Sequence, residues 1–241
     1  MKSFHGSLKL LNTIAYKMNK LNNLTKLYNL RFSSKNRKAK NRVWEVIIRH
    51  FIQYWIKPDF TVLDLGCGQG EFLNNIFCFR RIGVDLNPDN LKYLQPGIEF
   101  HCHSVTELSF LDDQSIDVVF TSNLMEHLLS KNDVISMLLE AKRVMKPYGK
   151  LLAIGPNINK LNGSYWNFWD HHIPITEKSL CEALTMLGYT IEKCVPAFLP
   201  FTTCSNLPKW SFLVWLYIKV PFLWSFMGKQ FFIVAIKDRH D

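Results

Sequence analysis

Three glycines at alternate positions form the first segment of this chain that could do chemistry. They lie in Asp64-Leu65-Gly66-Cys67-Gly68-Gln69-Gly70-Glu71, directly after an apolar run. Without a Cβ, the backbone N–H groups can approach a ligand closely, and a helix that begins after the turn adds partial positive charge. The dinucleotide pattern G-x-G-x-x-G requires glycine where Glu71 stands, and an acid fits poorly against a pyrophosphate. The spacing therefore favours a ligand other than a dinucleotide.

Asp85 ends the next apolar run, fifteen residues after Gly70. A carboxylate at the end of a second strand can accept both hydroxyl groups of a ribose, and NAD and S-adenosylmethionine sites share this role. The alternative is a turn or a helix cap within Asp85-Leu86-Asn87-Pro88. Asp85 thus indicates an adenosine ribose without distinguishing the two cofactors.

Two polar segments further along the chain are suited to a second substrate. The first includes Asn123, Glu126 and His127, and the second is Tyr165-Trp166-Asn167-Phe168-Trp169-Asp170-His171-His172. Aromatic faces pack against sugar rings or apolar ligands, while Asp and His can orient a hydroxyl or take its proton. The alternatives are a helix cap in the first segment and a loop that covers the sheet edge in the second. The candidate catalytic residues are His127, His171 and His172, and the candidate substrate contacts are Glu126, Tyr165, Trp166, Trp169 and Asp170.

Four segments in the same order resemble the motifs of class I S-adenosylmethionine-dependent methyltransferases, of the type 11-like group. Val62–Gly70 resembles motif I, Ile82–Asp85 the ribose motif, Ile116–Leu128 the fourth-strand segment, and Glu140–Leu151 the helix–turn–strand signature. The four segments cover about residues 60–157. The chain is also similar to a bacterial subgroup associated with cell-envelope polysaccharide synthesis.

This resemblance implies that S-adenosylmethionine is the cofactor. Asp64 and the backbone from Gly66 to Gly70 would hold the methionine portion, and Asp85 the ribose. The chain departs from the family pattern at Tyr148, which replaces the usual first glycine of a turn, and at Ser104, which stands where an adenine-side Asp is frequent. The expected cofactor residues are Asp64, Gly66, Cys67, Gly68, Gly70, Asp85, Leu86, Ser104 and Asn123.

The resemblance also bears on the acceptor and on metals. A sulfonium methyl group is a strong electrophile, so the protein mainly aligns the acceptor and needs a base only if the acceptor loses a proton. We expect O-methylation of a small-molecule or glycan-type acceptor, with a lipid-linked one favoured by the subgroup. The pair Glu126-His127 is similar to that of metal-dependent members, but Asn123 stands where their first acid would be. His101 and His103 have no third ligand at a suitable spacing, so we expect no metal.

Strands and helices must alternate to position these residues. This alternation predicts βαβ units and a mostly parallel sheet with helices on both faces. With the resemblance, the expected fold class is α/β, a Rossmann-like seven-stranded sheet with an antiparallel last strand. The predicted strands are Phe60–Leu65, Arg81–Leu86, Ile98–His101, Asp117–Thr121, Lys150–Gly155, Thr190–Val195 and Phe231–Lys237. The predicted helices are Val43–Tyr54, Glu71–Phe79, Val134–Met145 and Glu177–Leu187.

The positive charge is concentrated before the predicted sheet. Residues 1–50 contain twelve Lys or Arg and one acid, whereas residues 51–241 sum to −2. Apolar residues recur at helical spacing over Leu8–Leu30, so we divide the chain into a basic amphipathic extension, 1–41, and a methyltransferase domain, 42–241. Such an extension can attract phosphates or an anionic membrane, or it can be a solvated helix.

An apolar insert is expected at about 198–228, and it fits a lid, a dimer interface or a membrane-surface contact. Lys219 and Pro221 divide Trp210–Met227 into uncharged runs of about nine residues, which are too short to span a bilayer. The six cysteines form no C-x-x-C pair, and no secretory signal is visible. We therefore expect a cytoplasmic protein, and peripheral contact with the inner face of the membrane is part of this expectation.

Composition and charge narrow the function classes. The 241 residues are 48% hydrophobic and 20% charged, which excludes a disordered chain. One alternative is a nucleic-acid methyltransferase that uses the basic extension to hold phosphates. The nearly neutral body and the absence of an Asp/Asn-Pro-Pro-Tyr/Phe motif at Ser122-Asn123-Leu124-Met125 argue against it. The other alternative is a non-catalytic binding protein with this fold, against which the intact glycine segment and Asp85 argue.

Overall fold

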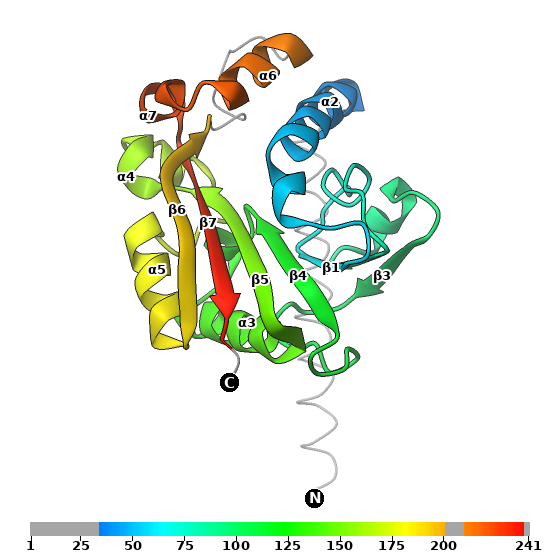
Figure 1. The fold of residues 1–241 in the computed structure, drawn as a ribbon. Coiled ribbons are helices and arrows are strands. Elements are labelled where there is room, and N and C mark those ends of the chain that lie inside the picture. Colours follow the sequence, from blue (N-terminus) through cyan, green and yellow to red (C-terminus); the bar gives the residue numbers. More distant parts are fainter. Residues whose placement is uncertain (1–33, 201–209, 239–241) are drawn as a thin grey trace, which may run out of the picture.

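A computed structural model describes residues 34–200 and 210–238, which surround a seven-stranded sheet (Figure 1). The strands lie in the order β3-β2-β1-β4-β5-β7-β6. Neighbours among β1 to β5 pair in parallel, whereas β7 pairs antiparallel with both β5 and β6. The predicted fold class and its antiparallel last strand are therefore confirmed. The strands are β1 Thr61–Leu65, β2 Arg80–Asp85, β3 Ile98–Cys102, β4 Ile116–Ser122, β5 Met145–Pro156, β6 Tyr189–Leu199 and β7 Gln230–Lys237.

Helices α3 and α5 begin where side chains cap them. The hydroxyl of Ser130 accepts a hydrogen bond from the backbone N–H of Asp133, and Thr176 forms a capping box with Ser179. Such caps satisfy N–H groups that have no partner within the helix. The α-helices are α2 Ser34–His50, α3 Lys131–Val144, α4 Ile158–Leu161, α5 Glu177–Met186, α6 Ser211–Lys219 and α7 Phe222–Met227. The 3₁₀ helices are η1 Ile52–Trp55, η2 Pro88–Tyr93, η3 Met125–His127 and η4 Ser164–Asn167.

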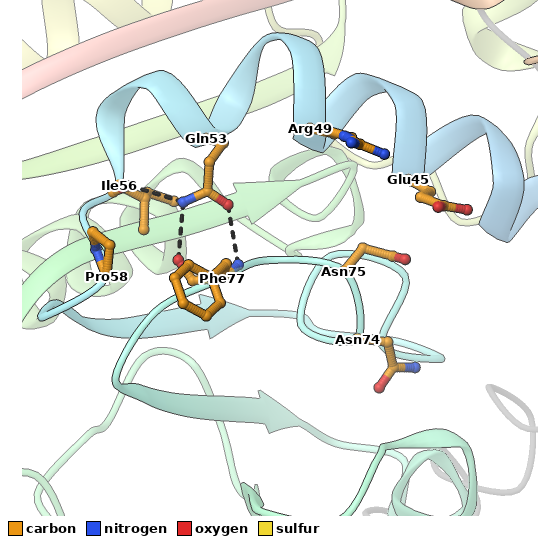
Figure 2. A pocket seen from close by; sticks show the side chains of 8 residues that line it. All are labelled: Glu45, Arg49, Gln53, Ile56, Pro58, Asn74, Asn75 and Phe77. Carbon is orange, nitrogen blue, oxygen red and sulfur yellow. Dashed lines mark hydrogen bonds between the residues drawn. The ribbon is translucent and has the colours of Figure 1, made fainter.

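The predicted helix Glu71–Phe79 is wrong, because the chain forms turns over residues 71–75 (Figure 2). Asn74 donates its side-chain N–H to the carbonyl of Tyr93, and its Oδ1 accepts the backbone N–H of Gln95. Asn75 donates its side-chain N–H to the carbonyl of Glu71. Asparagine side chains compete with helical hydrogen bonds in this way. The glycine segment is therefore followed by turns, and no helix N-terminus faces the ligand there.

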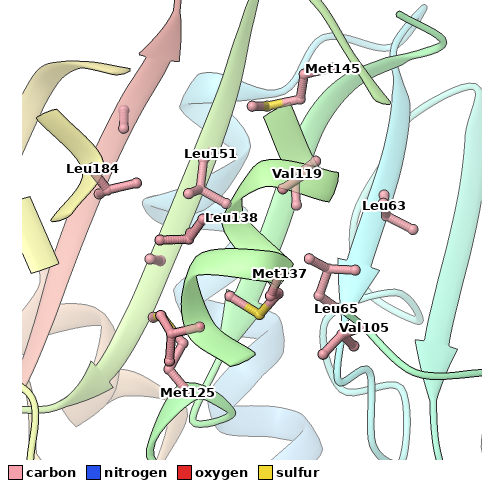
Figure 3. Close-up of a cluster of buried hydrophobic side chains, with 14 of the residues drawn as sticks. Leu63, Leu65, Val105, Val119, Met125, Met137, Leu138, Met145, Leu151 and Leu184 are labelled. Carbon is pink, nitrogen blue, oxygen red and sulfur yellow. The ribbon is translucent and has the colours of Figure 1, made fainter. Parts of the chain in front are cut away.

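The sheet separates two clusters of buried apolar side chains. Side chains alternate across a strand, so in β1 Val62 lies in one cluster and Leu63 and Leu65 lie in the other. Helices α3 and α5 cover the second cluster with residues such as Leu138 and Leu184 (Figure 3). Helices α2, α6 and α7 cover the first (Figure 1). Both faces of the sheet are thus buried, which explains why all five residues of β1 are buried.

Helix α2 and strand β5 both begin earlier than the sequence predicts. Helix α2 begins at Ser34 and runs across the predicted boundary between residues 41 and 42. Strand β5 begins at Met145, five residues before the predicted start. The predicted helix Leu8–Leu30 lies outside the described residues, as do residues 201–209 of the insert, and the domain division stays a prediction. Among the helices of residues 34–200 and 210–238, none is long and apolar enough to cross a membrane.

Candidate functional site

The glycine segment lies at the carboxyl end of β1, where the strand order reverses between β1 and β4. Open α/β sheets bind ligands at such a position. The backbone N–H groups of Gly66 and Cys67 both donate to the carbonyl of Val84 in β2, at 2.8 and 3.1 Å. The backbone N–H of Gly68 donates to Oδ2 of Asp85 at 2.9 Å. The loop is therefore held against the end of β2 by its own backbone.

The three glycines of this loop all have positive φ angles, which L-residues with a Cβ rarely adopt. Gly66 has a second constraint, because an added Cβ would lie 2.8 Å from Cδ1 of Leu124. At Gly68 an added Cβ would meet only Oε2 of Glu71, at 4.0 Å. Glycine at position 66 therefore permits close packing against the segment after β4, whereas glycine at 68 serves backbone conformation alone.

Acidic side chains are crowded beneath the loop. Asp64 and Asp85 are 3% and 8% exposed. Burial, followed by the charges of Asp85 and Glu71, raises the pKa of Asp64 well above its usual range. Burial also raises the pKa of Asp85, although backbone hydrogen bonds from Asn87 and Gly68 oppose the shift. This concentration of negative charge suits a ligand that carries positive charge.

Sequence reasoning missed one residue at this end of the site. Nζ of Lys40 in α2 lies 2.8 Å from Oε1 of Glu71, so a helix outside the sheet pairs with the glycine loop. The lysine falls within the segment 1–41 that was predicted as a separate extension. Lys40 lies in a run of basic residues, and its partner Glu71 is distant in sequence. No local pattern therefore indicates the pair.

The other expected cofactor residues surround the loop at different exposures. Cys67 is buried, and burial raises the pKa of its thiol above the usual range. Leu86 is 45% exposed. The hydroxyl of Ser104 lies 2.8 Å from that of Thr106, and Asn123 has a φ of +50° and donates its side-chain N–H to the hydroxyl of Ser122. All of them follow the carboxyl ends of β1, β2, β3 or β4.

The acceptor candidates come together from two segments that are far apart in the sequence. Nδ1 of His127 lies 3.0 Å from the carbonyl oxygen of Asp170 and 3.2 Å from its Oδ2. The rings of His127 and His171 are 5.0 Å apart, and Oε1 of Glu126 is 3.9 Å from Nε2 of His127. The backbone N–H of His172 donates to the carbonyl of Glu126 at 2.8 Å. The structure therefore joins the two predicted segments into one cluster.

Burial and charge oppose each other in this cluster. Glu126 is 1% exposed, and burial raises its pKa, partly offset by the charge of His127. Burial lowers the pKa of His127, but the hydrogen bond to Asp170 and the charges of Glu126 and Asp170 outweigh it, so the pKa is raised. A histidine with two acidic neighbours can bind a hydroxyl and hold its proton.

The aromatic residues of the second segment divide into buried and exposed ones. Tyr165 is fully buried, its hydroxyl donates to the carbonyl of Ile173, and its ring lies 4.7 Å from that of His171. The buried ring of Tyr165 packs against the ring of His171 and supports it. Trp166 and Trp169 are 52% and 89% exposed, so their faces are accessible.

A separate hollow of about 550 Å³ lies between α2 and the turns after the glycine loop (Figure 2). Gln53 spans it by donating to the carbonyls of Ile56 and Phe77 and accepting from the N–H of Phe77. None of the expected site residues lines this hollow. We therefore do not assign it to the functional site.

Comparison with known proteins finds a family match over part of the chain. Residues 63–153 match the family described as "Methyltransferase domain". The chain is 33% identical to an uncharacterized protein of Methanocaldococcus jannaschii over 51% of this chain and 52% of that protein. It is 26% identical to the 2-methyl-6-phytyl-1,4-hydroquinone methyltransferase of Synechocystis over 76% of this chain and 62% of that enzyme. The chain thus spans about half to three fifths of the length of these relatives.

The fold has counterparts among solved structures. A SAM-dependent methyltransferase from Archaeoglobus fulgidus matches with a TM-score of 0.61 and 22% identity, over 82% of this chain and 94% of that one. At 22% identity, this similarity shows that the two proteins share a fold. The family match covers the glycine loop, Asp85 and the segment after β4.

Proposed function

We propose that this chain, which carries a methyltransferase domain of the class I, S-adenosylmethionine-dependent fold, methylates a hydroxyl group of a small-molecule or glycan-type acceptor. The observation that carries the proposal is the contact between the two halves of the site. Leu124 packs on Gly66 of the loop, and Glu126 and His127 lie two and three residues after it. A cofactor in the loop and an acceptor at the cluster would therefore share one edge of the sheet.

The proposed reaction needs alignment and removal of one proton. A lone pair of the acceptor oxygen forms the O–CH₃ bond while the S–CH₃ bond breaks, and its electron pair stays on sulfur to give S-adenosylhomocysteine. The hydroxyl proton leaves toward the cluster of Glu126, His127 and Asp170. In-line alignment of this kind supplies several kcal/mol, about 7 or more in favourable cases.

The acidic groups support the cofactor assignment. S-adenosylmethionine carries positive charge on its sulfonium and ammonium groups, which suits the buried carboxylate of Asp64. Asp85 already accepts backbone N–H groups of Gly68 and Asn87, but each carboxylate oxygen has a second lone pair for a ribose hydroxyl. We assign the adenine side to Ser104, and further contacts to Leu86 and Asn123.

The acceptor side divides into contact and support. Trp166 and Trp169 are exposed and are assigned to acceptor contact, together with His172. Tyr165 is assigned to supporting His171, because it is fully buried and its ring packs against that of His171. The Synechocystis relative is by its name a hydroquinone methyltransferase, so a ring hydroxyl is a further candidate within the same acceptor class.

The helices of the insert support a lipid-linked acceptor at a membrane surface. Neither α6 nor α7 contains an Asp or Glu, and Lys219 is their one charged residue. The large apolar side chains exposed on and beside these helices are Trp210, Phe212, Leu213, Trp215, Leu216, Phe222 and Phe226. Apolar and aromatic side chains of this kind bind at the boundary between headgroups and acyl chains.

The first test is calorimetric titration with S-adenosylhomocysteine, with NAD in parallel. We expect saturable binding of S-adenosylhomocysteine alone, and its loss in Asp85→Ala. Asp89→Ala is the matched control, because this neighbouring aspartate is exposed and its side chain pairs with Lys92 at 3.5 Å. Unchanged affinity in Asp85→Ala would disprove the ribose assignment.

The second test is transfer of a labelled methyl group to fractionated acceptors. Lipid-linked glycans, free glycans, small phenols and RNA are supplied separately. We expect label in a hydroxyl-bearing glycan or small-molecule fraction. Label in RNA would support the nucleic-acid alternative, and cofactor binding without label in any fraction would support a binding protein.

A further inference from the structure

Three potential metal ligands converge after the carboxyl end of β4. Glu126, His127 and His171 each offer one ligand atom, and these atoms all lie within 4.8 Å of one another. The first two belong to η3, whereas His171 follows η4. With bonds of about 2.1 Å and tetrahedral angles, two ligand atoms of one ion lie about 3.4 Å apart. Binding an ion would therefore require these atoms to approach one another by up to about 1.4 Å.

The carboxylate of Glu126 is buried beside His127, with no direct hydrogen bond between the two side chains. Its residue is 1% exposed, and Nε2 of His127, 3.9 Å away, is beyond hydrogen-bond distance. Buried charges are normally paired or coordinate a metal, because an isolated one is costly to remove from water. An ion between Glu126 and the two histidines would bring positive charge closer to this carboxylate than His127 does at 3.9 Å.

The two histidines are held as metal ligands commonly are. Nδ1 of His127 faces the carbonyl and carboxylate oxygens of Asp170. When Nδ1–H donates to them, the lone pair lies on Nε2, the atom nearer to Glu126. An acidic partner behind a histidine fixes the ring and its tautomer in many metal sites. His171 is 7% exposed and stacks on Phe168 at 4.9 Å, so its ring orientation is fixed as well.

We propose that Glu126, His127 and His171 bind a divalent transition-metal ion of the manganese, iron, cobalt or zinc class. Two imidazoles and one carboxylate favour these ions over magnesium or calcium. The sequence predicted no metal because Asn123 stands where metal-dependent members have an acid. An acid at that position is not needed here, because the third ligand comes from the loop after η4.

The purpose of such an ion rests on the proposed function. Bound there, it would be a Lewis acid that lowers the pKa of an acceptor hydroxyl. Glu126, His127 and His171 would then hold the ion, the ion would bind the acceptor oxygen, and Asp170 would position His127. The existence of the site can be measured without any acceptor.

The experiment uses the full chain without a histidine tag, treated with a chelator and dialysed. It is titrated with Co²⁺ by calorimetry and by visible absorption, which reports nitrogen and oxygen coordination. We expect one Co²⁺ per chain, and affinities reduced at least about tenfold in Glu126→Gln and His171→Gln and about 10-fold to 100-fold in Asp170→Asn. Zn²⁺ and Mn²⁺ are titrated in competition, and Mg²⁺ should not displace Co²⁺.

Two controls make the result specific. His172→Gln removes an exposed histidine of the same loop and should keep the Co²⁺ affinity, as should Glu182→Gln on the exposed side of α5. Binding of S-adenosylhomocysteine is measured for every variant to show that the fold is retained. No saturable Co²⁺ binding, or equal affinity in the double variant Glu126→Gln/His171→Gln, would overturn the proposal. Failure of the proposed function would appear separately, as absent cofactor binding or absent methyl transfer.

Discussion

The cofactor end and the acceptor end of the site are built in different ways. At the cofactor end, a short continuous loop presents backbone N–H groups, and Asp64 and Asp85 flank it in sequence. At the acceptor end, His127 meets the carbonyl and carboxylate oxygens of Asp170 across 43 residues, and its ring lies 5.0 Å from that of His171. The first end depends on local backbone conformation, and the second on how two loops pack. This difference predicts that the ends can be damaged separately.

Glu126→Gln should separate methyl transfer from cofactor binding. In Glu126→Gln we expect methyl transfer to fall by about 100-fold or more, because the cluster loses its buried charge. Affinity for S-adenosylhomocysteine should stay unchanged, since Glu126 is outside the glycine loop. Turnover with a labelled methyl donor and calorimetry measure the two quantities. Equal loss of both would mean that the ends do not act separately.

Gly66→Ala should disturb both ends of the site, whereas Gly68→Ala should disturb the cofactor end alone. Both glycines have positive φ, so each substitution strains the backbone by about 1–2 kcal/mol. At position 66 the new Cβ also displaces Leu124, and overpacking adds about 1–3 kcal/mol. We expect Gly66→Ala to lower the free energy of unfolding more and to reduce both cofactor affinity and turnover. Urea denaturation of the two variants tests this order, and a larger loss in Gly68→Ala would contradict it.

Asp64→Asn tests whether the cofactor end is built for a ligand at the expense of stability. Burial and neighbouring acids raise the pKa of Asp64. A raised carboxyl pKa favours folding below the unfolded-state pKa, and that contribution is lost as the pH rises through the folded-state pKa. At neutral pH we therefore expect Asp64→Asn to raise the free energy of unfolding by about 1 kcal/mol while weakening cofactor binding.

The pH dependence provides the check on this variant. The gain should shrink as the pH falls through the raised pKa, because the native carboxyl is then neutral as well. Denaturation curves at neutral and acidic pH measure it. Lower stability of Asp64→Asn at neutral pH would show that the carboxylate makes a compensating interaction.

Tyr148→Gly should change the stability only slightly, because Tyr148 lies outside both ends of the site. Tyr148 is exposed and has a φ of +62°. Glycine relieves this strain of about 1–2 kcal/mol but loses about 0.5–1 kcal/mol in chain entropy. We expect a slightly higher melting temperature and unchanged cofactor affinity and turnover. A lower melting temperature would show that the exposed ring contributes to the fold.

Much of the sheet could be predicted because buried parallel strands are short apolar runs. Val62 and Leu63 both belong to buried clusters on opposite faces, so β1 was recognisable without any knowledge of its neighbours. The helix predicted at Glu71–Phe79 failed because Asn74 and Asn75 bond to groups outside the segment. Apolar spacing alone carries no information on such bonds.

The glycine loop, Asp85 and the Glu126-His127 pair could be recognised from residue type and spacing alone. Folding brings His171 and Asp170 to that pair, buries Tyr165 and places Lys40 against Glu71. The two groups differ in how far apart the interacting residues lie along the chain. Backbone conformation depends on neighbours in the chain, whereas contact between side chains from distant loops depends on the packing that brings those loops together.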